Sequence, residues 1–127
     1  MATITIYLKL VGTKKDYELQ WSYDQKTWEK VTPTSPSTEL DSDDELDWDA
    51  DDSIKKIQIK FKKGNIIPNS ILSGENTRKI RGRVKRGLAK GLKDSYTIKV
   101  QPAGGGGLKE YDPDVHTPPT PPPPTED

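Results

Sequence analysis

The sequence contains no cysteine, a single histidine (His116) and a single methionine. The absence of cysteine excludes disulfides, thiolate metal sites and cysteine nucleophiles. It is compatible with a reducing compartment, and the N-terminus shows no basic stretch followed by an apolar leader, so we expect a cytoplasmic protein. No apolar run approaches the roughly 18 residues that span a bilayer, so we expect no membrane partner.

Apolar residues make up only 30% of the chain, but they recur with a period of two. Apolar and polar residues alternate in five runs, at residues 4–10, 17–23, 57–61, 80–84 and 96–100. Such alternation indicates strands with one buried face, and no helical period extends beyond two turns. The pattern predicts an all-β fold, a single antiparallel β-sandwich of about six to eight strands, immunoglobulin-like or cupredoxin-like.

The composition changes near residue 104, which divides the chain into a predicted sandwich domain (1–103) and a tail (104–127). Four glycines form an expected hinge, and the short apolar island at 108–115 is a candidate for docking as an edge strand. The end of the chain is rich in proline, which favours polyproline II and predicts a disordered tail. Its P-x-x-P register from Pro118 to Pro121 suits a partner with an aromatic groove, although inert spacers have the same composition.

Charge is balanced overall, with 20 acidic and 20 basic residues, but it is sorted into two blocks. Residues 39–52 hold nine acids and no lysine or arginine, whereas residues 53–93 hold thirteen bases and one acid, Glu75. Segregation of this kind either folds back on itself or meets a partner of complementary charge. In the first case, the acidic block covers the basic face, and exposed pairs of this kind contribute only about 0–1 kcal/mol each.

The acidic block predicts a short edge strand, because its acids alternate with Leu46 and Trp48. Dense like charge at an edge also discourages pairing with another copy of the chain. A calcium loop is the competing interpretation, but counting from Asp41 places Leu46 where glycine is needed and Asp52 where glutamate is needed. We therefore expect no metal and no cofactor.

The sequence offers no arrangement typical of catalysis. His116 lies in the tail without a sequence-local partner, and the carboxylates lie in a solvated run where burial cannot tune them. No nucleophile elbow and no phosphate-binding glycine loop occurs. We expect a protein that is not an enzyme.

The main functional hypothesis is a non-catalytic binding or accessory module that engages another protein through charge-segregated surfaces. The candidate partner-binding residues are Asp41, Asp43, Asp44, Glu45, Asp47, Asp49, Asp51, Asp52, Arg81, Arg83 and Lys85.

The alternative is an anion or nucleic-acid binder that uses a basic sheet face formed by two neighbouring strands. Its candidate residues are Lys56, Lys60, Lys62, Arg81, Arg83 and Lys85. The absence of stacking aromatics disfavours it, because Trp21, Trp28 and Phe61 are predicted to point inward. The pI of about 6.6 also argues against a dedicated nucleic-acid binder.

Four segments carry a resemblance to a known group: Trp-Ser-Tyr-Asp at 21–24, the strands at 57–61 and 95–100, and Asp-Pro-Asp-Val at 112–115. Together they resemble small bacterial cupredoxin-like β-sandwich proteins of unknown function, over roughly residues 2–115. The resemblance implies the fold and little about activity. Copper-binding relatives use cysteine, histidine and methionine, which here are reduced to His116 and Met1, so copper chemistry is not expected.

Overall fold

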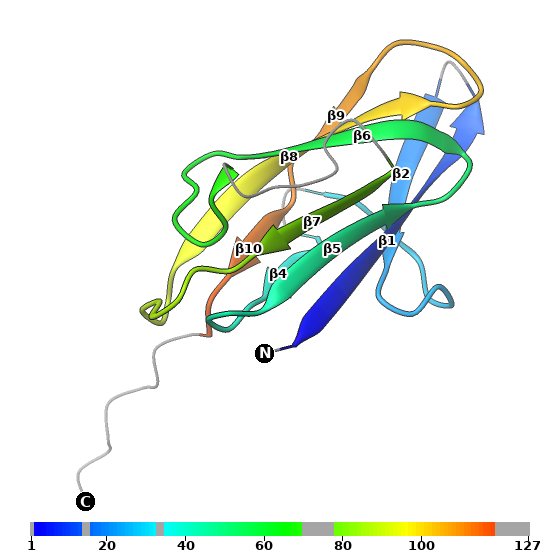
Figure 1. Ribbon diagram of the computed structural model, residues 1–127. Helices are drawn as coiled ribbons and strands as arrows, with labels where there is room; N and C mark the ends of the chain where they lie inside the picture. The colour runs from blue at the N-terminus through cyan, green and yellow to red at the C-terminus, as the bar shows by residue number, and fades with distance from the viewer. Residues whose placement is uncertain (1, 14–15, 33–34, 70–77, 119–127) are drawn as a thin grey trace, which may run out of the picture.

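The computed structural model describes residues 2–13, 16–32, 35–69 and 78–118, and it is all-β. These ranges contain ten strands and no α-helix. This confirms the all-β part of the predicted fold class, and Figure 1 shows the arrangement of the strands. None of their elements is a helix long and apolar enough to cross a membrane.

The first sheet contains five strands in the order β3-β2-β1-β5-β7. Their bounds are β1 Thr3–Thr13, β2 Asp16–Ser22, β3 Glu29–Lys30, β5 Glu45–Ala50 and β7 Lys79–Arg83. The long hairpin of β1 and β2 forms as the alternation predicts, with Leu8 opposite Trp21 and Leu10 opposite Leu19. At the turn, Gly12 has a φ of 110° and faces the backbone of Asp16, where no side chain fits.

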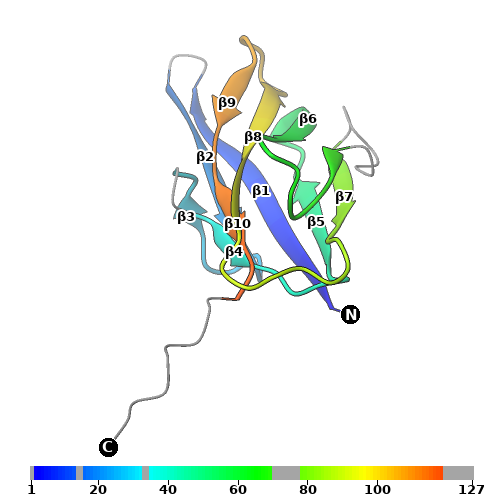
Figure 2. The ribbon, with the colours of Figure 1, turned by 90° about the vertical axis from the view of Figure 1, so that its left-hand side faces the viewer.

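The second sheet has the order β4-β10-β8-β6, and β9 also pairs with β8. Their bounds are β4 Ser37–Glu39, β6 Ile54–Phe61, β8 Lys93–Pro102, β9 Lys109–Tyr111 and β10 Asp114–His116. The two sheets form separate layers, as the two views show (Figure 1, Figure 2).

The prediction of a purely antiparallel fold is wrong in two places. β1 runs parallel to β5, with Ile6 opposite Trp48, and β10 runs parallel to β4. Alternation reports which face of a strand is buried, but it does not report strand direction. After β3 the chain crosses to the second sheet through β4, and it returns to the first sheet at the end where β1 begins, which makes β5 parallel to β1.

Three aromatic side chains join the two sheets through the core. Trp48 of the first sheet lies 5.4 Å from Tyr96 and 6.0 Å from Phe61, both of the second sheet, measured between ring centroids. The indole Nε1 of Trp48 donates a hydrogen bond of 3.2 Å to the Tyr96 hydroxyl. All three residues are at most 1% exposed, so the polar groups of Trp48 and Tyr96 satisfy each other where water cannot.

The stretch after the glycines contributes two strands to the second sheet. β9 pairs with β8, and β10 lies between β8 and β4, with Val115 fully buried. The glycines themselves lie against Tyr17, whose hydroxyl donates a hydrogen bond of 3.1 Å to the carbonyl of Gly105. The predicted disordered tail from residue 119 onward lies outside the described residues.

Candidate functional site

The acidic block forms β5, but it does not form the predicted edge strand. Leu46 and Trp48 point inward with no exposed surface, as predicted. β5 lies between β1 and β7 in the interior of the first sheet, because β7 pairs with it on the far side. The acids Glu45, Asp47 and Asp49 therefore share the outer face of that sheet with the basic residues of β7.

Four cross-strand ion pairs among the described residues cover this outer face, and one of them joins the Nε of Arg81 to the Oε2 of Glu45 at 3.5 Å. Arg81 contacts Asp47 through Nε–Oδ1 at 2.9 Å and Nη2–Oδ2 at 3.0 Å, a bidentate arrangement. Arg83 donates to Glu45 at 2.9 Å, and the Nζ of Lys79 lies 3.9 Å from Asp49. The hydrogen bond with Asp47, followed by the charges of Asp47 and Glu45, raises the pKa of Arg81. Acidic and basic blocks thus neutralise each other within this sheet.

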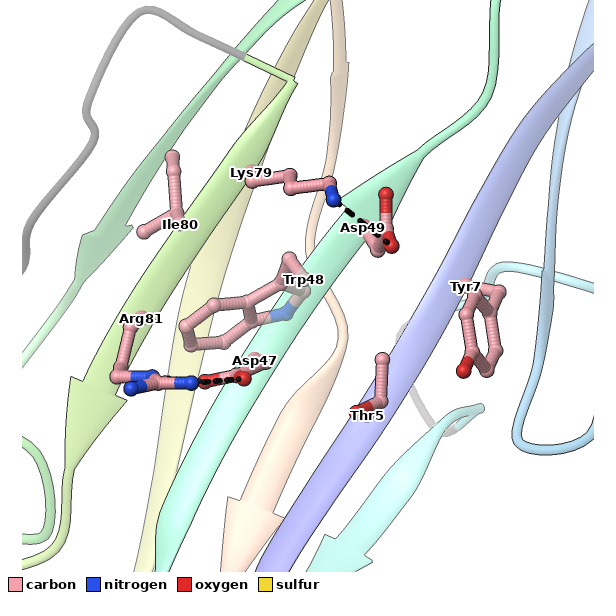
Figure 3. A pocket seen from close by; sticks show the side chains of 8 residues that line it. All are labelled: Thr5, Tyr7, Asp47, Trp48, Asp49, Lys79, Ile80 and Arg81. Atoms are coloured by element: carbon pink, nitrogen blue, oxygen red, sulfur yellow. Dashed lines mark hydrogen bonds and ion pairs between the residues drawn. The ribbon is translucent and has the colours of Figure 1, made fainter.

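The ion pairs border a shallow hollow of about 430 Å³ on the outer face (Figure 3). Figure 3 shows Tyr7 and Thr5 of β1 on one side of Asp47 and Asp49, with Arg81 and Lys79 on the other. The register explains this order, because Tyr7 lies opposite Asp49 and Thr5 opposite Asp47. The hollow therefore combines an aromatic ring with paired charges.

A second hollow of about 210 Å³ adjoins the first and shares Tyr7 and Asp49 with it. Its remaining lining comes from Leu8, Gln25, Trp28 and Asp51. The ammonium of Lys9 lies 4.2 Å from the centroid of the Trp28 ring, a cation–π contact. Trp28 was predicted to point inward, but it is half-buried, because it precedes the two-residue strand β3 and not a long return strand.

Hydrogen bonds within residues 22–27 order the loop that contains Gln25 and leads to Trp28. The carboxylate of Asp24 accepts from the backbone amides of Lys26 and Thr27 and from the Ser22 hydroxyl. These bonds, led by the one from Thr27, lower the pKa of Asp24. Gln25 adopts a φ of 62°, a left-handed conformation that is uncommon outside glycine and asparagine.

The outer face of the second sheet carries lysines with fewer acidic neighbours. Lys56 and Lys60 alternate with buried Ile57 and Ile59 on β6, as predicted. Lys60 borders a hollow of about 340 Å³ with Gln58, Thr97, Lys99 and Glu110. The one ion pair of the described residues on this face joins Lys99 to Glu110 at 3.5 Å.

The basic residues proposed as one anion-binding face lie in different sheets. β7, with Arg81 and Arg83, pairs with β5, whereas β6, with Lys56 and Lys60, pairs with β8. The condition that the two strands be neighbours in one sheet is therefore not met. Lys62 and Lys85 follow the ends of these strands, and both side chains are exposed.

The remaining acidic candidates occupy turns. Asp44 is 7% exposed, and its carboxylate accepts from the backbone amides of Ala2 and Asp41, so it holds the turn before β5. Asp43 pairs with Arg86 at 3.0 Å, while Asp41, Asp51 and Asp52 are exposed. Residues 2–13, 16–32, 35–69 and 78–118 contain no cluster of three or more histidine or acidic side chains placed to hold a metal ion.

His116 lies in β10 and not in an isolated tail. Its Nδ1 is 3.0 Å from the hydroxyl of Ser37, and its carbonyl accepts from the amide of Leu40. Sequence reasoning missed this residue's place in the second sheet, and it also missed Tyr7, Gln25 and Glu110 as surface groups. Of these residues, Tyr7 is the one that the sequence could have revealed as a surface group, because it occupies an outward position in the first alternating run.

Comparison with known proteins finds no matching family model and no matching curated protein.

Proposed function

We propose that this protein is a non-catalytic binding module that engages an acidic surface of another protein through the outer face of the second sheet. One observation carries the proposal: the charged side chains of β5 and β7 on the first sheet are paired with each other, whereas the outward lysines of β6 on the second sheet stay outside the ion pairs of the described residues. Lys56, Lys60 and Lys62 have no ion-pair partner among the residues that the structure describes.

The first-sheet residues in our sequence-based hypothesis become less suitable as the primary contact. A partner that binds Arg81 or Arg83 has to displace Asp47 or Glu45, which already hold them. A partner that binds Lys56 and Lys60 breaks no ion pair of the described residues. Complementary charge of this kind chiefly accelerates association and selects orientation. The exposed acids Asp51 and Asp52 remain candidates for a secondary contact.

Nucleic-acid binding is the second candidate function, because the same lysines suit phosphate groups. The zero net charge favours a protein over a polyanion. A β-sandwich of immunoglobulin-like or cupredoxin-like type is part of the proposal, supported by two sheets that share one core. A cytoplasmic location, expected from the cysteine-free sequence, is also part of it.

The test compares two labelled anions, a polyglutamate peptide and a single-stranded oligonucleotide, by fluorescence anisotropy at low salt. The binding variant is Lys56→Glu with Lys60→Glu. The matched control, Lys26→Glu with Lys30→Glu, makes the same change in net charge in β3 of the first sheet and in the loop before it. We expect polyglutamate binding that the first variant abolishes and the control retains.

Three results contradict the proposal. Equal loss in both variants indicates an effect of net charge and not of a face. Tighter binding of the oligonucleotide, with a steep dependence of affinity on salt, favours nucleic acid. No binding of either anion at about 50 mM salt, where such contacts are strong, removes both functions.

A further inference from the structure

Two hollows with Tyr7 and Asp49 in common lie on the first sheet, and we refer to them together as the groove. Their chemistry differs from that of the lysine face of the second sheet. The groove crosses the strands from the loop at Trp28 and Gln25 to Arg81 on β7. Neighbouring strands lie about 4.8 Å apart, which makes the part from β1 to β7 about 10 Å long. A disaccharide unit matches this length.

The charges in the first hollow are paired. Asp47 faces Arg81, and Asp49 faces Lys79, so both of its carboxylates have a cation. Asp51, in the second hollow, accepts hydrogen bonds from the amide and the hydroxyl of Ser53. A charged ligand has to break one of these pairs, whereas a neutral ligand does not. The pairs keep unused hydrogen-bonding capacity, because a carboxylate has about four acceptor positions and a guanidinium five donors.

Aromatic rings supply the apolar part of the groove. Tyr7 and Trp28 are both half-buried, and both line the second hollow. The ammonium of Lys9 lies over one face of the Trp28 ring, so a sugar has to use the other face or displace Lys9. Small-molecule sites usually combine aromatic surface with a few oriented polar groups. A ligand with an apolar ring face and a rim of hydroxyl groups satisfies both parts at once.

The loop that carries Trp28 and Gln25 is organised before any ligand arrives. Five hydrogen bonds link Ser22 and Asp24 to one another and to the amides of residues 24–27. Gln25, one of the residues that line the second hollow, is held in a left-handed conformation. Backbone strain of this kind persists where the surroundings enforce it and is concentrated at binding sites.

From these observations we propose that the groove on the first sheet binds a neutral oligosaccharide. Tyr7 and Trp28 contact the faces of the sugar rings. Asp47, Asp49 and Arg81 exchange hydrogen bonds with the hydroxyl groups. This site is independent of the lysine face on the second sheet.

The test is an NMR titration of the ¹⁵N-labelled full chain with a panel of neutral hexasaccharides of glucose, xylose, mannose and N-acetylglucosamine. Each sugar is added up to about 10 mM, which is enough to detect a millimolar Kd. We expect at least one sugar to shift the amide signals of Tyr7, Asp49 and Arg81 and the indole signal of Trp28. Tyr7→Ala and Trp28→Ala are expected to weaken this binding by about tenfold each, since partial burial of an aromatic side chain contributes on that scale.

Two controls keep the outcomes separate. Tyr23→Ala removes an exposed aromatic residue that lines neither hollow, and it is expected to bind sugar like the wild type. Lys56→Glu with Lys60→Glu is likewise expected to retain sugar binding, so failure of the proposed protein-binding function leaves this inference standing.

Three results overturn the inference. The first is the absence of shifts with every sugar of the panel. The second is a set of shifts that maps away from Tyr7, Asp49 and Arg81 in the wild type, a readout that does not depend on the variants folding. The third is preferential binding of a sulfated heparin hexasaccharide in the groove, which contradicts a neutral ligand.

Discussion

The guanidinium of Arg81 and the carboxylate of Asp47 lie directly opposite each other on β7 and β5 and share two hydrogen bonds of 2.9 and 3.0 Å. This contact helps to specify the register in which β7, at the edge of the first sheet, pairs with β5. A slip of one residue turns Ile80 from the core to the solvent and removes the partner of Arg81. Hydrophobic burial and charge pairing therefore select the same register.

Our first prediction concerns the coupling of this pair. In a double-mutant cycle of Arg81→Gln and Asp47→Asn, measured by urea unfolding, we expect a favourable interaction energy at low salt. Because Arg81 is exposed, about 1 M salt should remove most of it. Lys79→Gln with Asp47→Asn, two residues that do not face each other, is the matched cycle. Equal coupling in both cycles contradicts the assignment.

The second prediction concerns the polar contact inside the core. Tyr96→Phe removes the acceptor of the Trp48 indole N–H and leaves that donor buried without a partner. We expect the free energy of unfolding to fall by about 1–3 kcal/mol. Tyr7→Phe makes the same chemical change on the surface and should stay within about 0.5 kcal/mol of the wild type. Similar values for the two variants indicate that the Trp48–Tyr96 hydrogen bond contributes nothing.

The third prediction follows from the ionisation of Tyr96. Burial of its hydroxyl, opposed by the hydrogen bond from Trp48, raises the pKa of Tyr96 in the folded state. The contribution of the Tyr96 hydroxyl to the free energy of unfolding is fully present below pH about 10, the pKa of a tyrosine in the unfolded chain. Above that pH the contribution declines, because Tyr96 ionises in the unfolded chain and stays protonated in the folded one. The deficit of Tyr96→Phe relative to the wild type should therefore shrink at high pH. The measurement covers about pH 8 to pH 11, a range chosen around the same pKa of about 10. A constant difference in the free energy of unfolding between Tyr96→Phe and the wild type over this range contradicts the linkage.

The fourth prediction concerns Asn69, whose side chain binds the backbone of Phe61 as a neighbouring strand does. Its Oδ1 accepts from the Phe61 amide at 2.7 Å, and its Nδ2 donates to the Phe61 carbonyl at 2.9 Å. Asn69→Ala should lower the free energy of unfolding by about 1–2 kcal/mol and accelerate hydrogen exchange of the Phe61 amide. Asn65→Ala is the control, because the Oδ1 of Asn65 has no hydrogen-bond partner among the described residues. Unchanged exchange at Phe61 contradicts the prediction.

The fifth prediction concerns the strands after the glycines. A chain that ends at Gly107 lacks β9 and β10, which removes the fully buried Val115 and leaves both β4 and one side of β8 unpaired. We expect it to lose cooperative unfolding. A chain that ends at Pro118 retains both strands and is the control. Cooperative unfolding of the shorter chain, monitored by tryptophan fluorescence, contradicts this result.

The burial of individual side chains was the most predictable part of the fold. Leu46, Trp48, Ile57 and Ile59 all point inward, because a period of two determines the two faces of any strand. Strand order and direction were not predictable in this way. The parallel pairing of β1 with β5 depends on where the chain crosses between sheets, and no local pattern reports that crossing.

The candidate surfaces were predictable only as sets of residues. Alternation places Asp47 and Arg81 on outer faces, but it does not show that two strands 34 residues apart are neighbours. Because alternation does not report which strands are neighbours, we also predicted wrongly that Arg81 and Lys60 lie on one face. β9 and β10 have three residues each, too short for a period of two to be recognised.

The position of β10 has a consequence for biosynthesis. Because this strand joins β4 to β8, the second sheet has to wait for residues 114–116 to leave the ribosome before it closes. Until then β4 has no neighbour, although it was made some 75 residues earlier. A nascent chain in this state exposes the strand edges on which self-association begins. The hairpin of β1 and β2 is free to form early, whereas the second sheet closes only after β10 has been synthesised.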